Sequence, residues 1–254
     1  MRGNVFVPPS DTSPVRFSVL VPARNEEHYI GKCLDSLEEA AASYQASVEV
    51  IVIVNRCTDR TEEIARSYGC VVVQSEERNL SMLRNAGARA TRGEVLLTID
   101  ADSRVEGPLF SEIDEHLHTG RFVGGGTMTK FERMSLGIAC SAIILIVPLL
   151  FKYGPVSVGL LWCRKTDFDT IGGFDEAMLM AEDADFASRL KSLGKRSGRK
   201  YGTLRKTKMI TSCRKFDAGG DWVLVKRPSI VRAYLNGKDT QQAEEAYYGE
   251  NAPR

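Results

Sequence analysis

The stretch EVLLTIDAD, residues 94–102, is an apolar run that ends in two aspartates, Asp100 and Asp102. Its length and its Val, Leu and Ile content are typical of a strand buried on both faces. Ligands of open α/β sheets bind beyond the carboxyl ends of the strands, so the two carboxylates stand where a ligand would lie. Both can reach one divalent ion, and Mg2+ or Mn2+ completes its shell with phosphate oxygens and water. The alternative is an ordinary acidic turn.

Three similar apolar runs precede this one, and segments with helical periodicity separate them. The runs are Phe17–Val21, Val48–Val54 and Cys70–Val73, and the helical segments are Glu27–Ala42, Thr61–Tyr68 and Ser81–Ala90. The alternation predicts βαβ units with a largely parallel sheet. The fold class is therefore α/β, with a Rossmann-like, mostly parallel central sheet flanked by helices.

The chain has 254 residues, which suits a single large α/β domain. We expect a flexible leader at 1–15, the domain at 16–235, and a polar tail at 236–254. Its nucleotide-binding half would cover 16–103 and its acceptor half 104–235. The 34 basic and 33 acidic side chains nearly cancel, so net charge indicates no partner. Six cysteines without a C-x-x-C pair favour reduced thiols in a cytoplasmic protein.

A second acidic pair, Glu182-Asp183, opens the segment EDADFASRLKSLG, residues 182–194. At about 100° per residue, Asp183 lies near the centre of the apolar face, whereas Asp185 points toward solvent. A carboxylate at the edge of a cleft can act as a general base if burial raises its pKa. The alternative is that the pair only complements the helix dipole.

Basic residues cluster in the C-terminal third, where nine of the twenty residues at 189–208 are Lys or Arg. Few aromatic residues interleave with them, which argues against a stacking platform for nucleic acid. The cluster could neutralise a diphosphate, an anionic acceptor or lipid headgroups, or it could be a solvated surface.

Met134–Phe151 is a stretch of 18 residues without a charge, interrupted by Gly137, Ser141 and Pro148. It is too short and too broken for a comfortable membrane-spanning helix. A buried core helix is our first expectation, and the alternatives are contact with a membrane surface or with a second copy. Contact with a membrane would make a lipid-linked acceptor plausible and would place the protein on the inner face of the membrane.

Five motifs, taken in order, resemble those of the family 2 glycosyltransferases. They are FSVLVPARNEE, VIVNRCTDRT, RNLSMLRNAGARATRGEVLLTIDADS, LLWCRKTDFDTIGGFDE and EDADFASRLKSLG, and they run from about Phe17 to about Phe216. The resemblance implies a single GT-A domain. It also implies metal-dependent, inverting transfer of a sugar from a nucleoside-diphosphate sugar, by default a UDP-sugar, to a hydroxyl of a glycan, a lipid-linked or a small-molecule acceptor.

The resemblance also implies a set of residues that bind the nucleotide sugar: Pro22, Ala23, Asn25, Glu26, Asn55, Arg84, Asp100, Ala101, Asp102, Arg214 and Lys215. Within this set Asn55 would read the base, where relatives often carry an acidic residue. Arg84 would contact the base or the phosphates, Asp100 the ribose, and Asp102 the metal. Asp183 would be the general base, with Glu182 beside it.

Two other classes of function stay open at this point. A nucleotidyltransferase also combines an α/β nucleotide fold with carboxylate-bound magnesium, but it favours a glycine-rich loop after the first strand, and PARNEEHYIG has no glycine run. A non-catalytic, membrane-associated nucleotide-sugar binder is the second alternative. The acceptor and the oligomeric state are not specified by these motifs.

Overall fold

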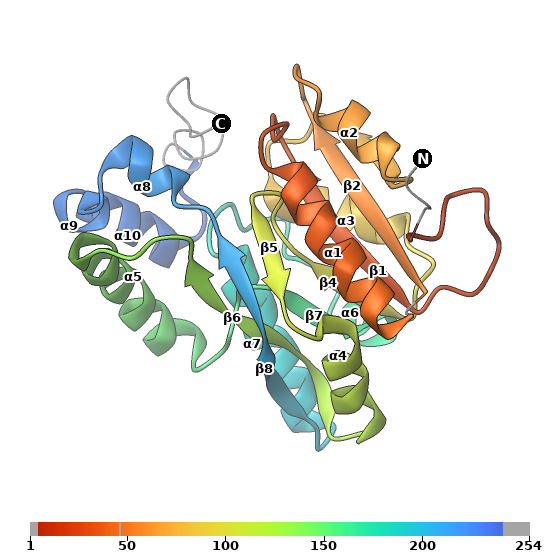
Figure 1. The fold of residues 1–254 in the computed structure, drawn as a ribbon. Coiled ribbons are helices and arrows are strands. Elements are labelled where there is room, and N and C mark those ends of the chain that lie inside the picture. The colour runs from red at the N-terminus through yellow and green to blue at the C-terminus, as the bar shows by residue number, and fades with distance from the viewer. Residues whose placement is uncertain (1–4, 46, 241–254) are drawn as a thin grey trace.

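A sheet of eight strands, in the order β3-β2-β1-β4-β7-β6-β8-β5, forms the centre of the computed structural model, which describes residues 5–45 and 47–240 (Figure 1). The strands are β1 (Phe17–Ala23), β2 (Val48–Asn55), β3 (Val71–Ser75), β4 (Val95–Thr98), β5 (Ser103–Glu106), β6 (Phe122–Phe131), β7 (Leu161–Arg164) and β8 (Lys200–Thr211). The helices are α1 (Ile30–Tyr44), α2 (Thr61–Ser67), α3 (Leu80–Arg89), α4 (Leu109–His118), α5 (Leu136–Tyr153), α6 (Lys165–Thr170), α7 (Glu182–Arg196), α8 (Arg214–Gly219), α9 (Val223–Lys226) and α10 (Pro228–Asn236).

The N-terminal half of the sheet is parallel, as the alternation of apolar runs and helices predicts. β1 lies between β2 and β4 and pairs parallel with both, and β2 pairs parallel with β3. Every residue of β1 and β2 is buried, because helices cover both faces of this half. The carboxyl ends of these strands therefore meet at one edge of the sheet.

The C-terminal half of the sheet is mixed. β7 pairs antiparallel with β4 and β6, β6 pairs parallel with β8, and β5 pairs antiparallel with β8. Glycines make the close approach of β6 to its neighbours possible. A Cβ atom on Gly125 would lie 2.2 Å from the Gly202 carbonyl oxygen, and one on Gly126 would lie 2.2 Å from that of Ser157.

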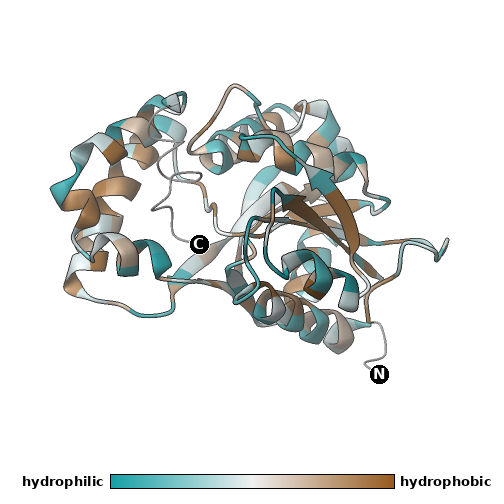
Figure 2. Ribbon diagram, turned by 90° about the horizontal axis from the view of Figure 1, so that it is seen from above, coloured by the Kyte–Doolittle hydropathy of each residue, from teal (hydrophilic) through white to brown (hydrophobic). Residues whose placement is uncertain are grey.

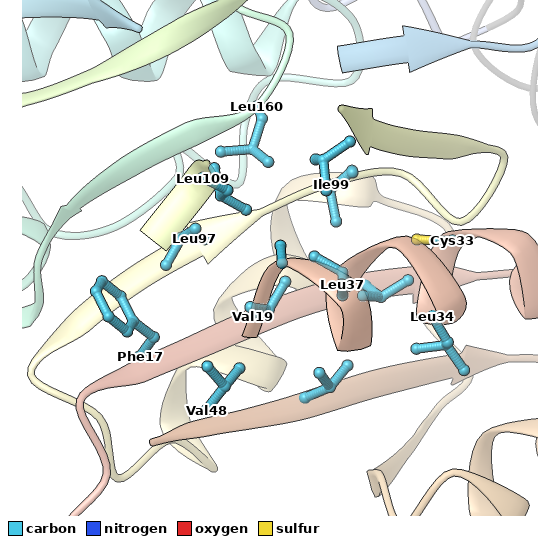
Figure 3. Close-up of a cluster of buried hydrophobic side chains, with 14 of the residues drawn as sticks. Phe17, Val19, Cys33, Leu34, Leu37, Val48, Leu97, Ile99, Leu109 and Leu160 are labelled. Carbon is cyan, nitrogen blue, oxygen red and sulfur yellow. The ribbon is translucent and has the colours of Figure 1, made fainter. Parts of the chain in front are cut away.

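Alternate side chains of the central strands enter two separate cores on the two faces of the sheet. Val19 and Val52 pack with α1 and α4 on one face, and Figure 3 shows part of that cluster around Leu34 and Leu37. Leu20 packs with α3, α6 and α7 on the other face. The period of two along each strand thus produces a three-layer α/β/α arrangement.

The N-terminal segment is not loose where the structure describes it. Phe6 is 1% exposed, and the Val7 amide donates to the Val48 carbonyl at 2.8 Å. The expectation of a flexible leader at 1–15 is therefore wrong for Phe6 and Val7, because Phe6 joins the core and Val7 is hydrogen-bonded to β2. Of the expected tail at 236–254, residues 241–254 lie outside the described residues, and Gly237 accepts hydrogen bonds from the Leu179 and Met180 amides.

Helices α5, α8, α9 and α10 form a group at one end of the sheet, which we call the helical lobe, residues 136–153 and 214–236 (Figure 1). α5 packs on α9 and α10, yet only Gly137, Ile138 and Ser141 of its residues are buried. The expectation that 134–151 forms a buried core helix is therefore wrong. Figure 2 shows α5 as a mostly apolar ribbon at the margin of the molecule.

Candidate active site

The carboxyl edge of the parallel strands carries the first pair of acidic residues. Asp100 and Asp102 occupy the tight turn between β4 and β5, so the strand end alone places both carboxylates at this edge. The Asp100 side chain is 55% exposed, and that of Asp102 is 10% exposed. Both line a cavity of about 830 Å³ that extends under the helical lobe. The structure thus places this pair beside a cavity, and its role in ligand binding stays a prediction.

Arg84, on α3, ties this edge to the start of α7. Its guanidinium donates to Thr98 Oγ1 at 3.1 Å, to Asp100 Oδ1 at 3.0 Å, and to Glu182 Oε1. Burial disfavours its charge, but the carboxylates of Glu182 and Asp100 outweigh that effect and raise the pKa of Arg84. Arg84 is only 4% exposed, so the expectation that it contacts base or phosphates is not met in this conformation. It is the internal counter-ion of two site carboxylates.

Of the second acidic pair, Glu182 is bound by Arg84 and Asp183 is not. Glu182 is 5% exposed and engaged by Arg84, whereas Asp183 is half-buried and accepts a hydrogen bond from the Ala184 amide at 2.7 Å. Burial, reinforced by the charge of Glu182, raises the pKa of Asp183 to about 7. A carboxyl group with such a pKa can accept a proton near neutral pH.

The prediction that the Asp185 side chain points toward solvent is wrong. Its side chain is 21% exposed and accepts from Arg189 Nε at 2.7 Å, and Arg189 also donates to the carbonyls of Ile171 and Gly173. The turn before α7 therefore covers this side of the helix. A periodicity argument cannot include that turn, because it belongs to a different segment of the chain.

Glu26, in the loop after β1, forms a second buried ion pair at the same edge. Arg214, the first residue of α8, donates to both Glu26 carboxylate oxygens at 2.7 Å, and its Nε lies 3.1 Å from Asp102 Oδ2. Ser212 also donates to Asp102 Oδ2 at 2.7 Å. Burial raises the pKa of Glu26 to about 7 despite the neighbouring guanidinium. Sequence reasoning missed Ser212, whose only signal is that it stands two residues before Arg214.

The loops after β1 and β2 hold each other in a strained conformation. Asn25 and Arg56 have φ values of 53° and 52°, in the left-handed region that costs free energy for residues other than glycine. Asn25 Oδ1 accepts from the Thr58 amide at 2.8 Å, and the Asn25 amide donates to Cys57 Sγ at 3.3 Å. Asn25 thus positions the two loops relative to each other.

Asn55, expected to read the base, is enclosed at the end of β2. It is 1% exposed, and its Nδ2 donates to the carbonyls of Ser75 and Glu77 at 2.8 and 2.9 Å. Its Oδ1 is buried without a hydrogen-bond partner among the described residues. In this conformation Asn55 therefore positions the segment between β3 and α3 and does not present its side chain to a ligand.

The remaining residues of the expected donor site differ in what they offer to a ligand. Pro22 and Ala23 end β1 and are buried, and Ala101 is 2% exposed, so these three can contribute only backbone groups. Lys215 lines the cavity together with the two aspartates. Of the expected set, the structure therefore gathers Asp100, Asp102 and Lys215 around one space.

The chemistry of the donor atoms fits a divalent cation of the Mg2+ or Mn2+ type. Asp100 and Asp102 supply hard carboxylate oxygens to the same cavity, and such ions are commonly held by one or two carboxylates plus substrate phosphates. No group of three or more His, Cys, Asp or Glu residues converges within residues 5–45 and 47–240. The rest of the coordination shell would therefore have to come from the ligand and from water.

A parallel N-terminal half of the sheet, a mixed C-terminal half, and an Asp-Ala-Asp turn between them define a GT-A glycosyltransferase fold. The solved structures agree. Residues 1–349 of TarS from S. aureus in complex with UDP-GlcNAc superpose with a TM-score of 0.54 at 22% identity, over 78% of this chain and 58% of that one. Glucosyl-3-phosphoglycerate synthase from Mycobacterium tuberculosis, in complex with Mn2+, UDP and phosphoglyceric acid, gives 0.52 at 18% identity, over 89% and 80%.

The sequence comparison points to one family within that fold. Residues 18–137 match the family model "Glycosyl transferase family 2". The "Uncharacterized glycosyltransferase EpsJ" of Bacillus subtilis is 32% identical over 103 residues, which are 39% of this chain and 29% of that protein. The family model covers slightly less than half of the chain, and together with such relatives it supports a family 2 glycosyltransferase. The chain aligns with less than a third of the length of such curated relatives. The residues that match the family model include the Asp-Ala-Asp turn.

Proposed function

We propose that this protein transfers a sugar from a nucleoside-diphosphate sugar, by default a UDP-sugar, to an acceptor hydroxyl, with inversion at the anomeric carbon. The observation that carries the proposal is that Arg84 binds both Asp100 and Glu182. This contact brings Asp183, which follows Glu182 and has a raised pKa, to the side of the sheet where the Asp100–Asp102 turn lies. A proton acceptor and a site for the diphosphate then lie at the same edge of the sheet. UDP in the two neighbouring solved structures supports the default choice of nucleotide.

The chemical step needs one base and one stabiliser of the leaving group. Asp183 accepts the proton of the acceptor hydroxyl while the acceptor oxygen forms a bond to the anomeric carbon. The bond between that carbon and the diphosphate oxygen breaks on the opposite face, and the nucleoside diphosphate leaves with the bonding electrons. Glu182 does not compete as a base, because Arg84 holds it. Attack opposite the leaving group inverts the configuration.

Two basic side chains of the protein can stabilise the negative charge on the leaving diphosphate. Lys215 lines the cavity, and Arg214 lies between Glu26 and Asp102. A divalent cation held by Asp102, with Asp100 nearby, would add electrostatic stabilisation of that charge. Mn2+ in the complex of glucosyl-3-phosphoglycerate synthase supports this choice of ion.

The test combines nucleotide binding with product analysis. Thermal-shift measurements with UDP, GDP and TDP, each with and without Mn2+, should single out one nucleotide. A ligand at about 100 times its dissociation constant stabilises a fold by about 2.7 kcal/mol, which such a measurement detects. Incubation with the matching sugar nucleotide should then release the nucleoside diphosphate.

Three outcomes would reject the proposal in different ways. Release of pyrophosphate would identify a nucleotidyltransferase. A nucleotide shift without turnover under any condition would identify a non-catalytic binder. A product whose anomeric proton shows retained configuration by NMR would exclude the single displacement with Asp183 as base.

A further inference from the structure

The exposed side of α5 carries an apolar stripe that no described residue covers. Ile143, Ile146, Val147 and Leu150 follow helical spacing and are 37% or more exposed, and Phe151 beside them is 87% exposed. Among residues 5–45 and 47–240, α5 is also the helix that is long and apolar enough to cross a membrane, with only 22% of it buried. Such a continuous apolar surface marks an interaction site.

We propose that the helical lobe docks on the surface of an anionic lipid bilayer, and that the acceptor is a membrane lipid that reaches the cavity beside Asp100 from that surface. The second part rests on the function proposed above. The first part rests on the exposure of α5, on the charge that flanks it, and on the way its two ends connect to the sheet.

The connections of α5 argue for docking on the membrane and against crossing it. β6 leads into α5 and β7 follows it, and these two strands are paired in the sheet, with Gly126 opposite Leu161. Both ends of α5 must therefore lie on the same side of a membrane. A crossing helix would have to return through the hydrocarbon as the irregular segment 154–160, whose backbone groups would lack partners there. An interfacial helix has no such cost.

The charges around the stripe favour anionic lipid as the occupant. Lys226 on α9, Arg232 on α10 and Arg227 between these helices are exposed, and both helices pack against α5. Trp222, just before α9, is 41% exposed. Basic residues next to an apolar helical surface, with an exposed Trp, are typical of interfacial segments.

The acidic residues of the lobe and its approach do not offset these cations. Asp217 and Asp221 both accept from Arg133, and Glu132 pairs with Arg104. A second copy of the chain is a poorer occupant, because a symmetric contact would bring the cations of α9 and α10 toward their own copies.

The same helix joins the docking surface to the cavity. Leu145 points into the cavity between the outward residues Ile143 and Ile146, and the cavity has apolar walls from Phe216, Leu224 and Ile230 of α8, α9 and α10. The lobe side of this space combines the apolar walls with Lys215 and Arg227, and the strand ends supply Asp100 and Asp102. Such a space fits an amphiphile, whose headgroup presents the acceptor hydroxyl.

Vesicle co-sedimentation tests the docking. We expect the native chain to bind phosphatidylcholine vesicles that contain phosphatidylglycerol. The triple variant Ile143→Ser, Ile146→Ser and Leu150→Ser should bind at least about 100-fold more weakly, because three apolar side chains no longer enter the interface. A control with two exposed apolar residues outside the lobe replaced, Val5→Ser and Tyr44→Ser, should bind like the native chain.

The electrostatic arm uses vesicles with and without the anionic lipid. Lys226→Gln with Arg232→Gln should weaken binding to the anionic vesicles about 30-fold, since each basic residue near the surface contributes about fivefold. The matched control, Arg89→Gln with Arg121→Gln, removes two exposed cations from other elements and should have no effect. Absence of native binding, or unchanged binding of the triple variant, would overturn the docking. The docking would also be overturned if the native chain bound no vesicle but formed a dimer in light scattering that the triple variant lost.

The acceptor is tested with a labelled sugar nucleotide and vesicles of a total polar lipid extract. Label should enter the solvent-extractable lipid, and the triple variant should reduce this at least tenfold while it keeps the native nucleotide thermal shift. Label found only in water-soluble product would overturn the lipid acceptor. Absence of any nucleotide thermal shift in the native chain would instead reject the function proposed above. Failure of the lipid acceptor and failure of the proposed function are therefore distinguishable.

Discussion

Arg214 holds both carboxylate oxygens of Glu26 at 2.7 Å, although 188 residues separate the two in the chain. The Arg214 side chain is 16% exposed and that of Glu26 is 8% exposed, so this is a buried ion pair at the edge of the cavity. It joins the loop after β1 to the first turn of α8. The helical lobe is thereby tied to the parallel N-terminal half at the place where Asp102 lies.

Removal of one partner of this pair should cost stability. Arg214→Met leaves the Glu26 carboxylate buried without its counter-ion, and such a change lowers the free energy of unfolding by about 3 kcal/mol. The double variant Arg214→Met with Glu26→Leu should recover only part of that loss, because the Asp102 carboxylate, 3.1 Å from Arg214 Nε, still lacks its cation. Urea unfolding of the two single variants and the double variant checks this. Arg133→Met, at an exposed pair, should cost about 1 kcal/mol or less. Equal losses at the two sites would contradict the burial argument.

Asp183→Asn should abolish most of the turnover while nucleotide binding persists. Loss of a positioned general base lowers kcat by about 10³-fold, and the nucleotide thermal shift should remain. Because the base must be deprotonated, native kcat/KM should rise with pH and level off above the Asp183 pKa of about 7. Asp185→Asn, on the same helix, is the control and should change kcat only within about threefold. A native rate that falls between pH 6 and 8 would exclude Asp183 as the base.

The same carboxyl group should make stability decrease with rising pH. The folded-state pKa of Asp183 lies above its ordinary value, so between about pH 4 and 7 the folded protein holds more protons than the unfolded chain. This contribution is fully present below the unfolded pKa and is lost as pH rises through about 7. Asp183→Asn removes the penalty, so at pH 8 its Tm should exceed that of the native chain by about 3 °C. At pH 4 the Tm values of the variant and of the native chain should agree. A Tm difference that stays the same from pH 4 to pH 8 would contradict the prediction.

Asp102→Asn should remove the effect of metal on nucleotide binding. The amide keeps an oxygen for the Ser212 hydroxyl but loses the charge that would hold a divalent ion. Mn2+ should increase the stabilisation that the nucleotide gives to the native fold, by up to about 2.7 kcal/mol when the ligand is at about 100 times its dissociation constant. In Asp102→Asn this increase should disappear from the thermal shift. Asp217→Asn, in the exposed pair with Arg133, should preserve it. Retention of the Mn2+ effect in Asp102→Asn would place the ion elsewhere.

Asn55→Asp should destabilise the protein, although it introduces the residue type that many relatives carry. Nδ2 of Asn55 donates to two backbone carbonyls, and an aspartate would set a negative oxygen against them. Two lost hydrogen bonds at a buried site cost about 2 kcal/mol or more. Denaturant unfolding measures the loss. A variant as stable as the native chain would show that the segment after β3 rearranges around the new carboxylate.

Several features of the site followed directly from local sequence. The buried strand before Asp100 and the helix that starts at Glu182 are both predicted by the sequence, because apolar periodicity and helix-start residues act within a few positions. The end of β4 also places Asp100 and Asp102 at the carboxyl edge of the parallel strands. In contrast, the roles expected of Arg84 and Asn55 depended on exposure, and both side chains are enclosed.

The sequence by itself therefore determined the α/β class, the parallel N-terminal half and the acidic turn, since these depend on short-range periodicity and on the end of one strand. Only the tertiary structure decided which charges meet. Arg214 reaches Glu26, and Arg84 is enclosed by carboxylates, because strand order and the position of the helical lobe bring distant segments together. The exposure of α5 was decided in the same way. An apolar helix is buried only where other elements cover it, and α9 and α10 cover one side of this one.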